Sequence, residues 1–126
     1  MEEVAAFDES NLFDGFTLDS EGGAWITTLV SNRLWHVAPD GTPRLLIEDA
    51  DADQVARLTD LQKHSSVPRT LLYEERGRTL RNISSVAFGG ADLRTAYLGS
   101  LMGRQLLTFR SPVAGMRPAH WDFGPW

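Results

Sequence analysis

The sequence of 126 residues contains no cysteine. Its absence excludes disulfide scaffolds, thiolate zinc sites and cysteine nucleophiles. There is also no apolar run close to the roughly 18 residues of a membrane span, so no membrane-spanning helix is expected. Hydrophobic residues still make up 42% of the chain. Together with the length, this share predicts one domain with a real core.

Basic residues are few and scattered. Lys63 is the only lysine, the eleven arginines stand singly, and the formal net charge is −5. Nucleic-acid binding needs a basic cluster, so no nucleic-acid partner is expected. The N-terminus is acidic and lacks the basic and apolar regions of a secretory signal. A cytoplasmic location is therefore expected.

Short apolar or β-branched runs alternate with turn-forming residues in the first half of the chain. The runs lie at 16–18, 25–30, 34–37 and 45–47, and the turns at 20–23, 31–33 and 39–42. Glycine supplies the positive φ that turns need, while Asp and Asn bond their own backbone. Four short strands joined by tight turns predict an antiparallel meander.

The same layout returns 72 residues further on. The aligned pairs are Trp25 with Tyr97, Ile26 with Leu98, Leu29 with Leu101, Leu34 with Leu106 and Val37 with Phe109. Upstream, a two-residue gap aligns Phe16 with Val86, and a fourth strand of the second unit is expected at 118–123. A repeated four-stranded meander is typical of β-propeller blades. The alternative is a single sandwich whose hairpins look alike.

Residues 50–81 interrupt the repeat. Asp51 or Asp53 is expected to cap a short helix that ends before Pro68. Residues 69–81 are expected to hold an extra hairpin, with a strand at 70–73 that turns back through Gly77. The predicted fold is therefore all-β: a four-stranded antiparallel blade at 11–49, a partly helical insertion at 50–81 and a second such blade at 82–123. The insertion would lie on one face of the disc, over the channel mouth or at an interface.

Two motifs carry a family resemblance. Residues 14–26, DGFTLDSEGGAWI, resemble the "DG-apolar-x-x-D-x-E-G-x-x-W" signature of the senescence-marker-protein/gluconolactonase/luciferin-regenerating family. Residues 84–98, SSVAFGGADLRTAYL, resemble its "TS-x-x-FGG-x-D-x-x-T-x-Y" motif. With the strands between them, the two motifs cover nearly all of the chain, which resembles the last two blades or so of that family.

The resemblance implies a six-bladed propeller with a divalent metal, calcium or zinc, in its channel, and hydrolysis of sugar or related lactones. The family holds its metal with a glutamate, an asparagine and the aspartate of the "DG" motif, and only this aspartate has a counterpart here, Asp14. Asp14 is thus the expected metal ligand and catalytic residue, since such a metal polarises the lactone carbonyl. The alternative is a turn aspartate that binds nearby backbone N–H groups.

Ser84 and Asn82 are the candidate substrate-binding residues. The repeat aligns Ser84 with Asp14, which places it at the same channel mouth on the next blade, and Asn82 could reach there as well. The alternative is that Ser84 only fills a tight strand start. Asp19 and Glu21 flank a hairpin and are expected to be solvated turn residues, and the histidines share no metal-ligand spacing.

Three functions follow as hypotheses: a lactonase-like hydrolase completed by other copies, a non-catalytic module that binds metal or ligand, and an inactive truncated family member. Two blades cannot close a propeller, and their open sides expose apolar faces and strand edges. A homo-oligomer is therefore expected, with a closed trimer favoured and a dimer through the insertion as runner-up. A small-molecule lactone is the other expected partner.

Overall fold

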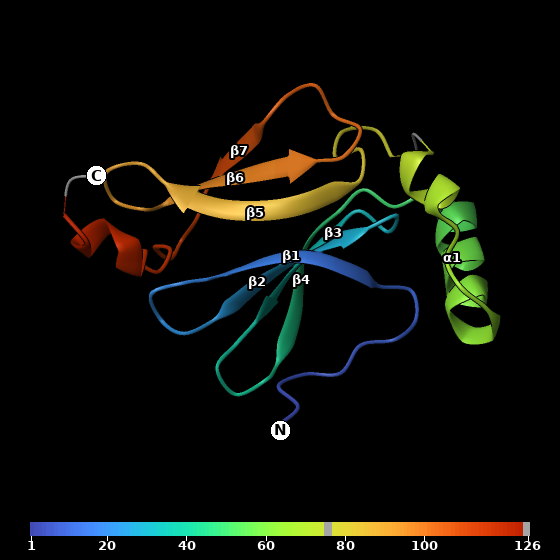
Figure 1. The fold of residues 1–126 in the computed structure, drawn as a ribbon, viewed down its shortest axis with the longest axis horizontal. Helices are drawn as coiled ribbons and strands as arrows, with labels where there is room; N and C mark the ends of the chain where they lie inside the picture. Colours follow the sequence, from blue (N-terminus) through green and yellow to red (C-terminus); the bar gives the residue numbers. More distant parts are fainter. Residues whose placement is uncertain (75–76, 125–126) are drawn as a thin grey trace.

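The first half of the chain is a four-stranded antiparallel sheet (Figure 1). Its strands follow one another in the order β1 (Leu12–Leu18), β2 (Ala24–Leu29), β3 (Arg33–Val37) and β4 (Pro43–Glu48). The structure is a computed structural model that describes residues 1–74 and 77–124. The predicted meander is confirmed.

Turn chemistry explains why the strands reverse where they do. Between β3 and β4, Asp40 accepts a hydrogen bond of 2.9 Å from the N–H of Thr42, and Gly41 has a φ of +86°. A residue with a side chain rarely adopts this angle, so glycine favours the reversal. The turn brings Pro43 opposite Val37 and fixes the register of the outer hairpin.

The second sheet has three antiparallel strands: β5 (Ile83–Gly89), β6 (Thr95–Ser100) and β7 (Leu107–Arg110). The prediction of a fourth strand at 118–123 is wrong, because a short 3-10 helix, Ala119–Asp122, lies there. Proline has no N–H for a strand ladder, and the N–H of Trp121 bonds instead to the carbonyl of Pro118 at 3.1 Å. The backbone groups of this segment thus bond to each other within the 3-10 turn and do not form a strand ladder.

The two sheets share one pairing scheme. Trp25 pairs with His36 in the first sheet, and Tyr97 pairs with Thr108, 72 residues further on, in the second. Phe16 pairs with Ile26, as Val86 pairs with Leu98. The repeat seen in the sequence is therefore a repeat of strand register.

The sheets stack face to face, with β1 and β5 side by side and running in the same direction (Figure 1). Trp25 is 2% exposed, and its ring lies 5.2 Å from that of Phe88 and 6.2 Å from that of Phe109. The indole of Trp25 therefore packs between the two sheets. The buried residues between the sheets are Trp25, Leu34, Leu80, Ile83, Val86 and Leu98.

The insertion contains the helix α1 (Ala52–His64), capped by Asp51 as predicted. The hairpin predicted within residues 69–81 is wrong at its first strand, 70–73, because Arg69–Tyr73 is a 3-10 helix. Residues 75 and 76 lie outside the described residues. The physical reason is burial: Leu71 packs with Leu58 of α1 in a second apolar cluster.

Helix α1 stands at the end of the sheets where β1 and β5 begin (Figure 1). Its Gln62 donates a hydrogen bond of 3.2 Å to the carbonyl of Asn11, just before β1. The insertion is thus at the strand-start end of the molecule. Within the described ranges, no helix is long and apolar enough to cross a membrane.

Candidate functional site

The first strands of the two sheets carry matching irregularities. The register of β1 shifts between Phe13 and Phe16, at Asp14 and Gly15, and that of β5 shifts between Ile83 and Ser85, at Ser84. Such bulges bend a strand and re-aim its side chains. The sequence alignment of Asp14 with Ser84 therefore corresponds to a shared structural position.

Close backbone contact brings the two bulges together. A Cβ on Gly15 would collide with the carbonyl oxygen of Ser84 and lie 2.9 Å from the Cα of Ser85. Only glycine allows this approach. On the other side, the buried hydroxyl of Thr27 accepts from the N–H of Gly15 at 3.2 Å and lies 3.1 Å from its carbonyl oxygen. The bulge of β1 is therefore held from both sides.

Asp14 itself is exposed at this position. Among the described residues, no hydrogen bond or ion pair engages its carboxylate. It does not act as the turn aspartate that the alternative interpretation required. Ser84, from the neighbouring strand, is half-buried. The structure thus brings these two predicted site residues to one edge of the molecule, where the bulges of β1 and β5 meet. The Asp14 carboxylate is available there to a ligand.

Asn82 has a different place. Its side chain is buried, with Oδ1 accepting from the N–H of Val30 at 2.8 Å and Nδ2 donating to the carbonyl of Leu72 at 2.6 Å. Its own N–H donates to Oδ1 of Asn32 at 2.7 Å. These bonds join the first sheet, the insertion and the start of β5. Asn82 is a buried structural link and does not reach a surface where a substrate could bind.

The donor set at this edge was compared with what a metal needs. Calcium takes six to eight oxygen ligands, and zinc takes about three from the protein. Over the described residues, no group of three or more His, Asp or Glu side chains could hold a metal. Asp14 offers one carboxylate. The residues of a single chain therefore do not fit the metal that the family resemblance implies.

A second polar cluster was missed by the sequence analysis. Asp19 is only 1% exposed, and its Oδ2 accepts from Nε1 of Trp25 at 2.9 Å and lies 2.9 Å from Nε2 of His36. Its Oδ1 accepts from the N–H groups of Glu21 and Gly23. The expectation of a solvated turn residue is wrong for Asp19, whereas Glu21 is exposed. The sequence feature that could have indicated this burial is Trp25, six residues after Asp19, whose indole N–H needs an acceptor when the ring is buried.

Burial acts to raise the pKa of the Asp19 carboxyl, but the hydrogen bonds from Trp25, Gly23 and His36 outweigh it. The pKa therefore lies below its ordinary value of 3.8. Its stabilising contribution is present above pH 3.8 and is lost as the pH falls through the lowered pKa. These features fit a structural role, in which Asp19 fixes the β1–β2 turn and the core tryptophan.

We expect Asp19→Asn to lower the free energy of unfolding by about 1.5–3 kcal/mol at pH 7, because hydrogen bonds to a buried charge are lost. Below pH 3.8 the difference between the variant and the parent should shrink as the pH falls toward the lowered pKa, since the Asp19 carboxyl of the unfolded parent binds a proton there. Urea unfolding at pH 7 and pH 3 measures both. Glu21→Gln, at an exposed neighbour, is the control. A constant difference across this pH range would contradict the assignment.

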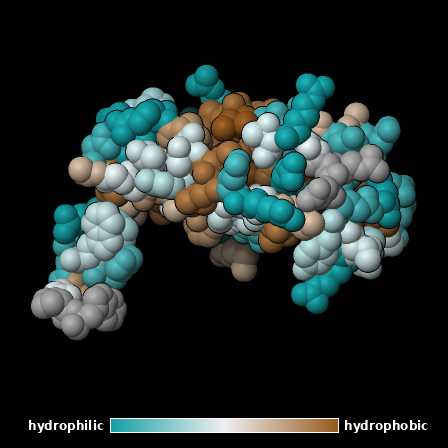
Figure 2. All heavy atoms as spheres, turned by 90° about the horizontal axis from the view of Figure 1, so that it is seen from above, coloured by the Kyte–Doolittle hydropathy of each residue, from teal (hydrophilic) through white to brown (hydrophobic). Residues whose placement is uncertain are grey.

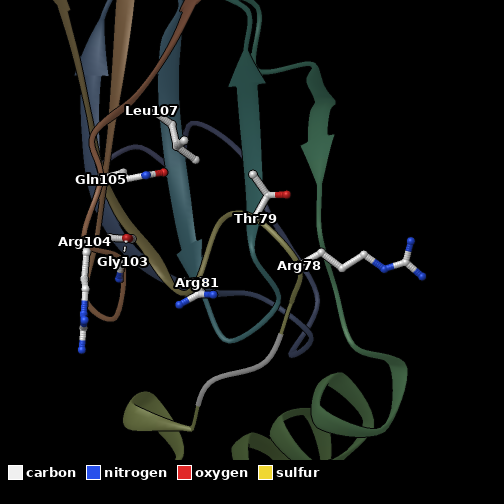
Figure 3. A pocket seen from close by; sticks show the side chains of 8 residues that line it. Arg78, Thr79, Arg81, Gly103, Arg104, Gln105 and Leu107 are labelled. Atoms are coloured by element: carbon white, nitrogen blue, oxygen red, sulfur yellow. Dashed lines mark hydrogen bonds between the residues drawn. The ribbon is translucent and has the colours of Figure 1, made fainter.

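The surface also has a cavity away from these residues. A cavity of about 350 Å³ lies between residues 78–81 and the turn before β7. Figure 3 shows that the Arg78 and Arg104 side chains extend away from it, while Gln105 and Leu107 point toward the segment that carries Thr79. Arg78 and Arg104 therefore do not converge on an anion in this cavity.

No family model matches the sequence, and among curated proteins none matched it either. The family resemblance therefore stays a prediction that rests on the two motifs.

Proposed function

We propose that this chain is a pair of β-propeller blades that supplies Asp14 to a lactonase-type hydrolytic site. The propeller is supported by two sheets of equal register, stacked face to face with their first strands adjacent. In a propeller, such sheets surround a central channel. Asp14 and Ser84 would then lie on the channel side, at one end.

The observation that carries the proposal is the exposed, unengaged carboxylate of Asp14 beside the bulge at Ser84. Gly15 and Thr27 hold the backbone of the bulge that carries Asp14, and their contacts leave its carboxylate free for a ligand. This is the arrangement expected of a residue that serves a ligand. The half-buried Ser84 is proposed to contact the substrate from the next blade.

The chain does not supply a complete site. Because one carboxylate does not hold calcium or zinc, the remaining ligands must come from other blades. The proposed activity, hydrolysis of a sugar or related lactone, therefore belongs to an assembly in which several copies meet. A cytoplasmic location stays a prediction.

We expect Asp14→Asn to weaken binding of Ca²⁺ or Zn²⁺ at least about tenfold. Even the replacement of a residue that only orients a metal ligand lowers metal affinity by about that factor. The free energy of unfolding should change by less than about 1 kcal/mol, as for exposed residues. Isothermal titration with each ion measures the first effect, and urea unfolding measures the second.

The matched control is Asp60→Asn, which removes an exposed carboxylate on α1 that takes no part in the proposed site. Equal metal affinity of Asp14→Asn and the parent would rule out the proposed role. Hydrolysis of an aldonolactone, followed by acid release at constant pH, distinguishes the enzyme from a binder. The proposed activity requires turnover that Asp14→Asn removes.

A second candidate is a module that binds metal or ligand without turnover. It is favoured by the position of Asn82, whose side chain is committed to Val30 and Leu72 and leaves only Asp14 and Ser84 at the edge. Metal binding without lactone hydrolysis would support this candidate. Neither binding nor hydrolysis would support the third, an inactive truncated member.

A further inference from the structure

The contact between the two sheets uses one face of each. The first sheet contributes the face that carries Trp25 and Leu34, and the second contributes the face that carries Val86, Phe88 and Leu98. Each sheet also has an opposite face. We call the opposite face of the first sheet the upstream face (Phe16, Leu18, Ala24, Ile26, Trp35, Val37) and that of the second sheet the downstream face (Ala87, Tyr97, Leu106).

The upstream face repeats a surface that is buried elsewhere in the same chain. By strand register, Phe16 is the equivalent of Val86, and Ile26 is the equivalent of Leu98. Phe16 is 69% exposed, whereas Val86 is 5% exposed. A groove of about 520 Å³ lies on this face, and Val4, Ala5 and Phe7 of the N-terminal segment form part of its lining. The face therefore has the composition of an interface and only a partial cover.

The downstream face repeats the other half of the internal contact. Tyr97 is the equivalent of Trp25, and Leu106 is the equivalent of Leu34. Leu106 is 62% exposed, whereas Leu34 is 0% exposed. Viewed from above, apolar residues reach the surface across the middle of the molecule (Figure 2). Glycine at position 89 leaves room for the Tyr97 ring, which would lie 2.9 Å from a Cβ there.

We propose that the downstream face of one copy docks on the upstream face of a second copy, in the manner in which the first sheet docks on the second within one chain. A second copy is the indicated occupant because this chain carries both halves of the contact, in matching register. The contact of Trp25 with Phe88 predicts that Tyr97 touches Leu18 of the next copy. Val37, the equivalent of Phe109, is only 2% exposed and is already buried within the chain. The proposal does not depend on any metal role of Asp14.

Such a contact joins different faces, so it is head-to-tail and must close into a ring to remain finite. The six blades that the family resemblance implies would correspond to a ring of three copies. Light scattering after size-exclusion chromatography should therefore give a mass of several protomers at micromolar concentration. A single protomer of 14.0 kDa would overturn the proposal.

Two variants block one face each. Phe16→Glu blocks the upstream face and Leu106→Glu the downstream face; both residues are exposed, so each variant should fold. Burying an unpaired charge should raise the dissociation constant at least about 100-fold, which leaves protomers. The control, Tyr73→Glu, alters an exposed residue of the insertion and should leave the assembly intact.

Mixing the two variants gives the sharper result. Each retains the face that the other has lost, so the mixture should form one-to-one pairs and nothing larger. A mixture that stays as protomers, or variants that still assemble alone, would overturn head-to-tail docking.

If either variant does not fold, a disulfide cross-link between copies tests the same contact. The chain has no cysteine, so a Leu18→Cys, Tyr97→Cys double variant has only these two thiols. Mild oxidation should join separate copies through them, in a ladder on a non-reducing gel. The single variants should give at most cross-linked pairs, and a double variant without a ladder would contradict the proposed contact.

Discussion

Replacing Trp25 with alanine is expected to lower the free energy of unfolding by roughly 3–5 kcal/mol, as for other buried tryptophans. The indole contacts Phe88 and Phe109 across the sheets and lies 5.3 Å from the ring of His36. Its loss opens a cavity in the centre of the intersheet core. It also removes the hydrogen bond from Nε1 to the buried Asp19. Urea unfolding followed by circular dichroism measures the change.

Two further variants separate the effect of packing from that of the hydrogen bond and provide a control. Trp25→Phe keeps most of the packing but loses the hydrogen bond to Asp19, so its loss of stability should be smaller than that of the alanine variant. Trp121→Ala removes a half-exposed tryptophan outside the sheets and should change the free energy of unfolding by less than about 1 kcal/mol. A similarly small loss in Trp25→Ala would show that the sheets do not pack through this residue.

Replacing Asn82 with alanine is expected to cost about 2–5 kcal/mol. The variant leaves the N–H of Val30 and the carbonyl of Leu72 without their partner, and each buried unsatisfied group costs about 1–3 kcal/mol. Asn82 also has a φ of +61°, which alanine adopts at a cost of about 1 kcal/mol. Thermal and urea unfolding both measure the loss.

Asn82→Gly separates the two causes. Glycine tolerates the positive φ but makes no side-chain hydrogen bond, so it should recover only about 1 kcal/mol of the loss. Full recovery by glycine would assign the effect to backbone strain alone. Asn82→Asp keeps an acceptor for Val30 but places a second oxygen against the carbonyl of Leu72, so it should also destabilise the protein.

The strands and turns of both sheets could be predicted because their signals are local. Alternating apolar residues and turn residues such as Gly41 lie within a few positions of one another. The cap of α1 at Asp51 is equally local. Because the two units repeat, the sequence alignment also predicted which strand positions are equivalent. The alignment of Asp14 with Ser84 therefore matched two bulges that no local pattern indicates.

Errors arose where distant residues decide the structure. Apolar residues at 70–73 resemble a strand, but Leu71 is buried against Leu58 and the chain turns into a 3-10 helix. Asp19 looks like a surface turn residue until Trp25 and His36 are placed around it. Burial of a polar side chain depends on tertiary contacts, and a single sequence does not reveal them.

The link between Asn82 and the first sheet also bears on the order of folding. Each sheet is built from hairpins with short connections, whereas the hydrogen bonds of Asn82 to Val30 and Asn32 span 52 and 50 residues. Local hairpins close in microseconds, but contacts of high sequence separation form only after a long loop has closed. The entropy of that closure grows slowly with loop length. The insertion therefore costs little in equilibrium stability, and its main effect is on the rate at which two preformed sheets meet.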